Sequence, residues 1–143
     1  MNVAGILKEK GSDVLTVAAD VSVADAAKSL TDRKIGAVVV AGADGGVGGI
    51  LSERDIVRGV AAHGAGVLTQ PVSSLMTAEV VTCSLEDTVD ELMDLMTGRR
   101  IRHIPVIDDG ALKGIISIGD VVKTRIAETE AEANALKEYI ATG

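Results

Sequence analysis

The sequence has few of the residues on which many binding and catalytic sites depend. Its 143 residues include one tyrosine, no phenylalanine, no tryptophan, one cysteine and two prolines. With almost no aromatic rings, stacking of bases or sugars on side chains is nearly excluded, and the core must be built from aliphatic residues and methionine. The single cysteine, Cys83, cannot form an internal disulfide, and we expect a buried, unreactive thiol.

Two further absences concern membranes and nucleic acids. No apolar run approaches the ~18 residues of a membrane span, and the N-terminus lacks the pattern of a signal peptide. We therefore expect a cytoplasmic protein that does not bind membranes. The net charge of −7 argues against a nucleic-acid groove, because such a groove needs a concentrated basic face. A hydrophobic content of 47% with 24% charged residues is typical of a globular protein.

An internal repeat is the main feature that is present. The matched pairs include Thr16 with Thr82, Ile35 with Ile101, Val40 with Val106, Ser52 with Ser117 and Asp55 with Asp120. The offset is 66 residues up to Val40 and 65 residues from Ser52 onward. Each copy carries an Asp-Gly pair, at 44–45 and 109–110, which predicts a β-hairpin turn. The one-residue change of offset falls near the first turn, where a change of length is tolerated.

Each copy predicts the order strand, helix, strand, strand, helix. The expected ranges are 14–17, 22–33, 37–40, 47–51 and 55–62, then 80–83, 88–98, 103–107, 112–116 and a helix from residue 117. A unit of about 50 residues buries too little surface to be stable alone, so the two copies should pack around a pseudo-twofold axis. The chain then divides into repeat 1 with an N-terminal segment (1–63), a linker (64–71), repeat 2 (72–123) and a C-terminal helical extension (124–143).

The last predicted helix is too long for the repeat. It runs to about residue 140, and its apolar side chains are spaced alternately four and three residues apart, as in a coiled-coil heptad. The stripe consists of Val122, Ile126, Thr129, Ala133, Leu136 and Ile140. It either packs back onto its own chain or contacts a second copy in a homodimer. The dimer is favoured, because little core remains for a protruding helix to cover.

Four predicted helices begin with a Ser or Thr followed three residues later by an acidic residue: Ser22 and Asp25, Ser52 and Asp55, Thr88 and Glu91, Ser117 and Asp120. This spacing alone indicates only a capping box. Ser52 and Ser117 differ from the others because each follows a hydrophobic strand directly. A helix that begins there offers free N–H groups, and its carboxylate could accept hydrogen bonds from a vicinal diol.

The two copies resemble a tandem pair of cystathionine-β-synthase (CBS) domains, also called a Bateman module, from about residue 6 to residue 123. The motifs that carry the resemblance are IGAVVV at 35–40, GILSERD at 49–55, RIRHIPV at 100–106 and GIISIGD at 114–120. Modules of this family bind AMP, ADP, ATP, NAD or S-adenosylmethionine between the repeats and usually act as regulatory sensors. The chain is especially similar to small stand-alone proteins of this kind. The implied fold class is α/β (α+β), with two βαββα repeats packed through their sheets and a long C-terminal helix.

The resemblance also implies roles for individual residues. Asp55 and Asp120 would hold a ribose diol, and the backbone at 35–38 and 102–105 would read the adenine edge between aliphatic side chains. The implied ligand-binding set is Thr16, Ile35, Gly36, Ala37, Val38, Ser52, Arg54, Asp55, Thr82, Arg102, His103, Ile104, Pro105, Ser117, Ile118 and Asp120. Further candidate phosphate contacts are Lys34, Arg58, Arg99, Arg100 and Lys123. A solvated helix end is the competing interpretation of each basic residue.

The two pockets should not be equivalent. Gly36 stands where the second copy has Arg102, and Gly119 stands where the first copy has Arg54. We therefore expect different phosphate chemistry in the two sites.

The sequence contains no supported catalytic or metal-binding constellation, so neither an enzyme nor a metal site is expected. The most plausible function is a cytoplasmic energy or redox sensor with an adenine nucleotide ligand, a homodimeric assembly and an unknown downstream protein. The alternative is a ligand-free scaffold that uses the CBS fold and the long helix for assembly.

Overall fold

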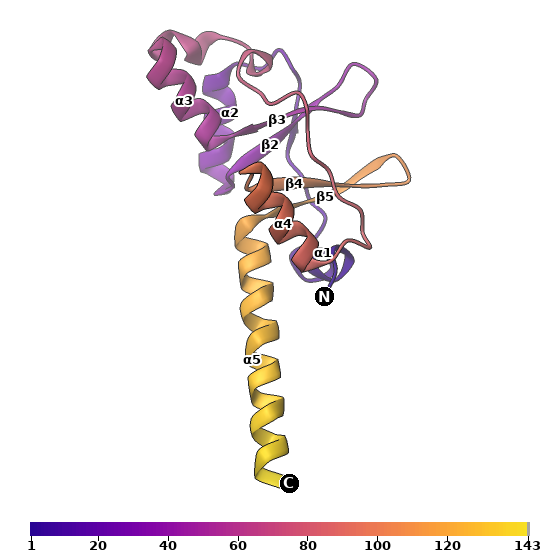
Figure 1. Cartoon of the computed structure of the whole chain (residues 1–143). Helices are drawn as coiled ribbons and strands as arrows, with labels where there is room; N and C mark the ends of the chain where they lie inside the picture. Colours follow the sequence, from indigo (N-terminus) through magenta and orange to yellow (C-terminus); the bar gives the residue numbers. More distant parts are fainter. Residues whose placement is uncertain (143) are drawn as a thin grey trace.

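Two similar halves form the body of the molecule, and one long helix projects from it (Figure 1). The computed structural model describes residues 1–142. The elements in chain order are α1 (Val3–Lys10), β1 (Thr16–Val17), α2 (Val23–Arg33), β2 (Ala37–Ala41), β3 (Val47–Ser52), α3 (Glu53–His63), the 3₁₀ turns η1 (Ala65–Thr69) and η2 (Val72–Ser74), α4 (Val89–Arg99), β4 (His103–Asp108), β5 (Ala111–Ser117) and α5 (Ile118–Thr142). The expected mixed α and β class is confirmed.

Each half contains one small sheet. In the first, β1 pairs parallel with β2 and β2 pairs antiparallel with β3; in the second, β4 pairs antiparallel with β5. The strand expected at 80–83 is reduced to a single parallel bridge between Cys83 and Val106. The second hairpin turns at Asp109 and Gly110, both with positive φ (51° and 75°), as a two-residue hairpin loop requires.

The predicted helix caps are present. The side-chain oxygen of Ser22 accepts a hydrogen bond from the backbone N–H of Asp25 (3.1 Å), and that of Thr88 accepts one from Glu91 (3.2 Å). These local bonds satisfy donors that the first turn of a helix leaves free, and they fix the starts of α2 and α4.

The first helical segment of each repeat packs in the core of the other half. Val3, Ile6 and Leu7 of α1 belong to the core of the second half, whereas Val72 of η2 belongs to the core of the first. The sequence-based division placed the N-terminal segment with repeat 1, whereas the apolar face of α1 packs in the core of the second half. Amphipathic periodicity shows that a helix has a buried face, but it does not show which core receives that face.

Two glycines at equivalent positions allow this exchange. A Cβ on Gly114 would lie 2.6 Å from Cδ2 of Leu7, and a Cβ on Gly49 would lie 2.5 Å from Sδ of Met76. Any larger residue at either glycine would push the incoming segment away. Leu7 and Met76 thus play corresponding roles in the second and first halves.

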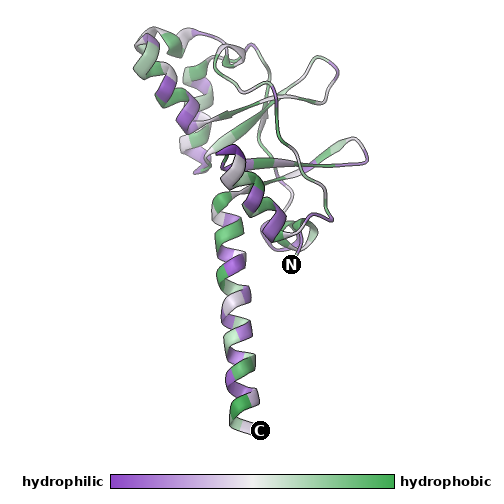
Figure 2. Ribbon diagram, viewed as in Figure 1, coloured by the Kyte–Doolittle hydropathy of each residue, from purple (hydrophilic) through white to green (hydrophobic). Residues whose placement is uncertain are grey.

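Helix α5 buries only the start of one face. Val121 and Thr124 are buried, whereas Val122, Ile126, Leu136 and Ile140 are 45%, 54%, 59% and 68% exposed. Figure 2 shows several hydrophobic segments along α5, which leaves the body of the protein. The interpretation that the stripe packs back onto its own chain is therefore wrong. Within residues 1–142, no helix combines the length and the apolar character needed to cross a membrane. Gly143, the last residue of the predicted extension, lies outside the described residues.

Cys83 is buried in the second core, as expected. Burial, together with the nearby carboxylate of Asp87, raises the pKa of its thiol to about 12. A thiol with that pKa carries almost no thiolate at neutral pH, so it is a poor nucleophile.

Candidate ligand-binding site

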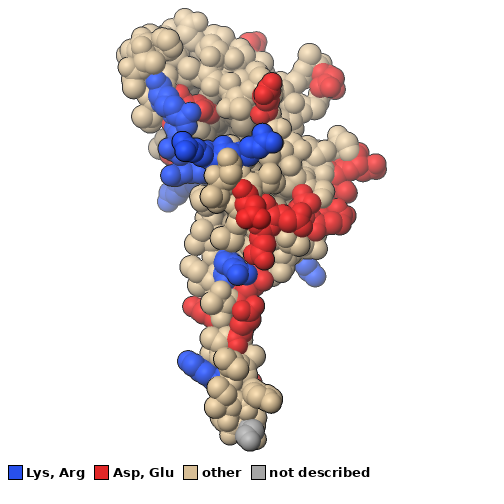
Figure 3. Space-filling model, viewed as in Figure 1, with Lys and Arg blue, Asp and Glu red and all other residues tan. Residues whose placement is uncertain are grey.

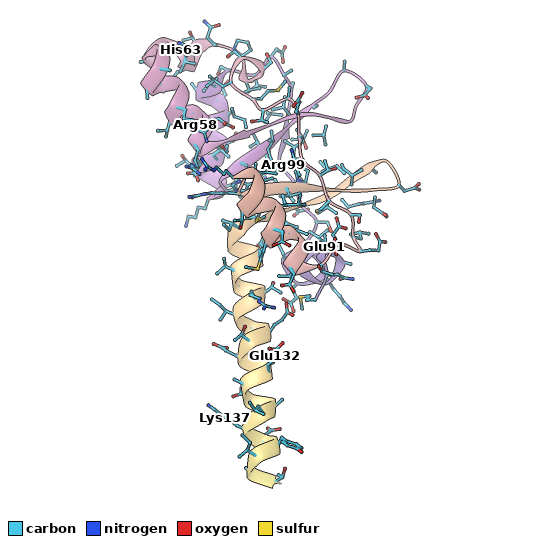
Figure 4. All side chains as sticks on the ribbon, viewed as in Figure 1. Arg58, His63, Glu91, Arg99, Glu132 and Lys137 are labelled. Atoms are coloured by element: carbon cyan, nitrogen blue, oxygen red, sulfur yellow. The ribbon has the colours of Figure 1, made fainter. Side chains whose placement is uncertain are left out.

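A cavity of about 720 Å³ lies between the two halves and is lined by residues of both. Asp55 and Asp120, the two predicted diol-binding residues, both line it. Figure 4 labels Arg58 on α3 and Arg99 on α4, which point into the region where the halves face each other. Both of these arginines also line the cavity. Its volume is within the range of small-molecule and cofactor sites.

The starts of α3 and α5 are held against the neighbouring strands. The backbone N–H of Glu53 donates to the carbonyl oxygen of Gly36 (3.0 Å), and that of Ile118 donates to the carbonyl oxygen of Arg102 (2.8 Å). These corresponding bonds exist because each helix follows its strand without a loop. They fix the first turn of each helix beside the cavity.

Both aspartates are helix caps. The backbone N–H of Ser52 donates to Oδ2 of Asp55 (2.9 Å), and the N–H of Asp55 donates to the hydroxyl of Ser52 (3.2 Å). Ser117 and Asp120 repeat this arrangement at 2.9 and 3.2 Å, with a third bond from the Ser117 hydroxyl to Oδ2 of Asp120 (3.0 Å). No residue that the structure describes donates to Oδ1 of either aspartate. A carboxylate used for capping thus still offers an acceptor atom to a ligand.

Lys10 distinguishes the two aspartates. Its ammonium lies 2.6 Å from Oδ2 of Asp120 and 2.7 Å from the carbonyl oxygen of Ile115. Burial alone would raise the pKa of Asp120, but the hydrogen bonds from Lys10 and from the Ser117 backbone outweigh it and hold that pKa below its usual value. Sequence reasoning missed Lys10, because it lies 110 residues from Asp120 and outside the four motifs that carry the resemblance.

Comparison with known proteins decides the family. The family model described as "CBS domain" matches residues 7–62 and 72–126, which together are more than half of the chain. The chain belongs to the CBS-domain family. It is 38% identical to the mitochondrial CBS domain-containing protein CBSX3 of Arabidopsis thaliana, over 99% of this chain and 72% of the relative.

Solved structures agree with this assignment. A CBS-domain containing protein from Agrobacterium tumefaciens is 55% identical, with a TM-score of 0.85 over 87% of this chain and 99% of that one. The CBS domain pair of protein MJ0100, solved in complex with 5′-methylthioadenosine and S-adenosyl-L-methionine, is 25% identical, with a TM-score of 0.77 over 90% and 98%. The present chain is therefore a CBS pair in fold as well as in sequence.

The cavity of this CBS pair brings together most of the residues that the resemblance implied. Those that line it are Ile35, Gly36, Ala37, Ser52, Arg54, Asp55, Arg102, His103, Ser117, Ile118 and Asp120. Thr16, Val38, Thr82, Ile104 and Pro105 do not line it. Leu15 and Val81, the residues just before the two threonines, line it instead. Since side chains alternate along extended backbone, Thr16 and Thr82 are turned out to solvent, and both are exposed.

Basic side chains surround the cavity of the CBS pair. Lys34, Arg54, Arg58, Arg99, Arg100 and Arg102 line it, whereas Lys123 does not. Figure 3 shows a group of Lys and Arg side chains where the two halves meet, away from the acidic face of the second half. Among residues 1–142, none of these six forms an ion pair. In a chain with a net charge of −7, such a local cluster favours an anionic ligand.

Metal binding has no comparable support in this part of the molecule. No group of three His, Cys, Asp or Glu side chains within residues 1–142 is arranged to hold a metal ion. The acidic side chains that line the cavity, besides the two capping aspartates, are Asp13, Glu53 and Glu79.

Proposed function

We propose that this CBS pair is a regulatory module that binds an adenosine-containing ligand between its repeats. The candidate ligands are AMP, ADP, ATP, NAD and S-adenosylmethionine, and the output is an energy or redox signal passed to a protein partner. The observation that carries the proposal is the environment of Asp55. Its carboxylate is fixed at a helix start, has a free Oδ1 atom and lies in the same cavity as the basic cluster.

The cavity offers each part of such a ligand a matching group. The carboxylate of Asp55 suits a ribose diol, and the six basic side chains suit phosphate oxygens. Ile35 and Ile118 line the cavity and are 36% and 42% exposed, so they present apolar surface to an adenine ring where aromatic residues are lacking. The complex of the MJ0100 pair with two adenosine derivatives supports the same ligand class.

Thermal unfolding with AMP, ATP, NAD and S-adenosylmethionine tests the proposal. A ligand present at 100 times its dissociation constant adds about 2.7 kcal/mol to the free energy of unfolding. For a chain of this size the midpoint should rise by roughly 5–10 °C. If none of the four ligands shifts the midpoint, the sensor function is excluded.

Asp55→Asn isolates the role of the carboxylate. Asn retains capping ability but loses the charge that strengthens a bond to a diol, so binding should weaken by about 1.5–3 kcal/mol. Asp25→Asn is the matched control, because Asp25 occupies the same position in α2 and does not line the cavity. Unchanged ligand affinity in Asp55→Asn, with a lower melting point, would show that Asp55 is only a cap.

We also propose that α5 pairs with α5 of a second copy. An isolated helix of 25 residues gains little from tertiary packing, and the exposed heptad stripe gives it an apolar face to bury. A partner with the same stripe matches that face in length and spacing. The ligand-free scaffold is the competing function, and it would use the same helix with an empty cavity.

Ile126→Glu tests this assembly, with sedimentation velocity as the measurement. A charge in the stripe should dissociate the dimer at micromolar concentration while the melting of the body is unchanged. Ala131→Glu lies on the opposite face of α5 and is exposed, so it should leave the dimer intact. A wild-type monomer, or a dimer that survives Ile126→Glu, contradicts the proposal.

We expect no catalytic activity, and the cytoplasmic location stays a prediction.

A further inference from the structure

Lys10 takes the place that a backbone group takes in the other half. In the first half, the edge of β3 is covered by Thr77, whose backbone N–H donates to the carbonyl oxygen of Ile50 (2.9 Å). In the second half, the equivalent carbonyl of Ile115 accepts from the Lys10 ammonium (2.7 Å). The repeat has thus exchanged a neutral backbone donor for a cation at the same position beside the cavity.

That cation reaches the second diol-binding carboxylate, and nothing comparable reaches the first. Oδ2 of Asp120 accepts three hydrogen bonds, of which the one from Lys10 is the shortest (2.6 Å). Oδ2 of Asp55 accepts only from Ser52, and Asp55 forms no ion pair with any described residue. The side chains of Lys10 and Asp120 are 31% and 22% exposed, so the pair is partly shielded from water.

A matched charge changes what the carboxylate can bind. The hydroxyl groups of a diol are neutral donors. They form strong hydrogen bonds to a carboxylate when no cation already neutralises its charge. At Asp120 the ammonium already supplies a charged donor to Oδ2, so a diol that uses both carboxylate oxygens would have to displace it, and a diol bound at Oδ1 alone would form a weaker bond. Displacement would also leave the Lys10 ammonium without its charged acceptor.

We propose that Lys10 is a specificity-determining residue that prevents ribose from binding to Asp120, so that the CBS pair binds one nucleoside per chain, at Asp55. This inference rests on the proposed adenosine-ligand function and refines it. The second half then contributes mainly basic side chains, Arg99, Arg100 and Arg102, to the phosphates of the ligand held at Asp55.

Isothermal titration calorimetry of the full chain with AMP measures the number of sites. Wild type should bind one AMP per chain. Lys10→Met keeps the aliphatic stem but removes the ammonium, and it should open a second site with an affinity within about tenfold of the first. Lys10→Arg restores a cation and should return the stoichiometry to one. Lys8→Met, an exposed position on the same helix with no ion pair among residues 1–142, should also bind one.

2′-Deoxy-AMP identifies the nature of the new site, because it lacks the diol. The site opened in Lys10→Met should bind AMP at least about tenfold more tightly than 2′-deoxy-AMP. Two AMP per wild-type chain, or one AMP in both wild type and Lys10→Met, overturns the inference and leaves the proposed function standing. Loss of AMP binding in a folded Lys10→Met protein also overturns it, since Lys10 would then be a ligand contact. If neither protein binds AMP or the other three ligands, the proposed function fails.

Discussion

His103 fills the space that Gly36 leaves open on the other repeat. A Cβ built on Gly36 would lie 2.9 Å from Nε2 of His103 and 3.1 Å from Oε1 of Glu53. Gly36 directly precedes β2 and His103 begins β4, and the starts of these two equivalent strands approach each other between the halves. Two large side chains would collide there, so the small residue of the first copy permits the imidazole of the second. The difference in side-chain size between the two copies at this contact is therefore required by packing, and it also makes the two copies chemically different.

Gly36→Ala tests this contact. The added methyl group must move His103 or Glu53, and we expect a loss of about 1–2 kcal/mol in the free energy of unfolding by urea. In a His103→Ala background the loss should nearly vanish. Gly98→Ala is the opposite control, because nothing lies within 4 Å of a Cβ at Gly98, and alanine in α4 should stabilise by about 0.5–1 kcal/mol. An equal loss from Gly36→Ala with and without His103 would refute the contact.

Lys34 and Arg100 end α2 and α4 in the left-handed conformation, with φ of 55° and 54°. A residue with a Cβ is strained there, so Lys34→Gly and Arg100→Gly should each raise the free energy of unfolding by about 0.5–1 kcal/mol. Both side chains line the cavity, so the same changes should weaken ATP binding more than adenosine binding.

Arg33→Gly serves as the control for these two changes. Arg33 is the last residue of α2 and does not line the cavity, so glycine there should lower stability by up to about 1 kcal/mol without changing ATP affinity. Lower stability in Lys34→Gly would show that the left-handed conformation costs little at this position.

Leu7→Ala tests whether α1 is part of the second core. Leu7 is 6% exposed and fits against Gly114, so its truncation should cost about 2–4 kcal/mol, measured by urea unfolding. Lys8→Ala, on the exposed side of the same helix, should change stability by less than about 0.5 kcal/mol. If both variants unfold at the same urea concentration, α1 is not docked as described.

The environment of His103 makes the free energy of unfolding depend on pH. Burial and the Lys10 ammonium lower its pKa from 6.5, and these effects exceed the opposing ones of Glu53 and Asp120. As the pH falls below 6.5, the unfolded chain takes up a proton that the folded chain resists, so stability is present above that pH and is lost below it. His103→Asn should reduce the loss of stability measured between about pH 7 and pH 5.

Much of the fold could be predicted from neighbouring residues. The caps at Ser22, Thr88, Ser52 and Ser117 form within three residues of chain, and the structure contains all of them. The two hairpins likewise follow from an Asp-Gly pair between two apolar segments. The strand predicted at 80–83 is not a full strand, because this segment pairs with the second sheet through a single bridge.

Only those parts of the candidate site that both copies of the repeat carry could be predicted from the sequence. The motifs placed Asp55 and Asp120 at one cavity, because both copies carry these carboxylates in matching positions. The threonines and Lys123 do not line it, since a one-residue change in strand register or a turn of helix decides which side chain points inward. Neither choice can be read from a motif.

By itself the sequence determined the doubled architecture, the helix starts and the pairing of two carboxylates, because these depend on interactions over a few residues or on the repeat. The three-dimensional fold was needed to show that α1 joins the second core and that α5 leaves its stripe exposed. It also decided that Lys10 reaches Asp120 and that His103 packs on Gly36. Those contacts join residues 67 to 110 positions apart that do not correspond in the repeat, so neither local propensity nor internal symmetry specifies them.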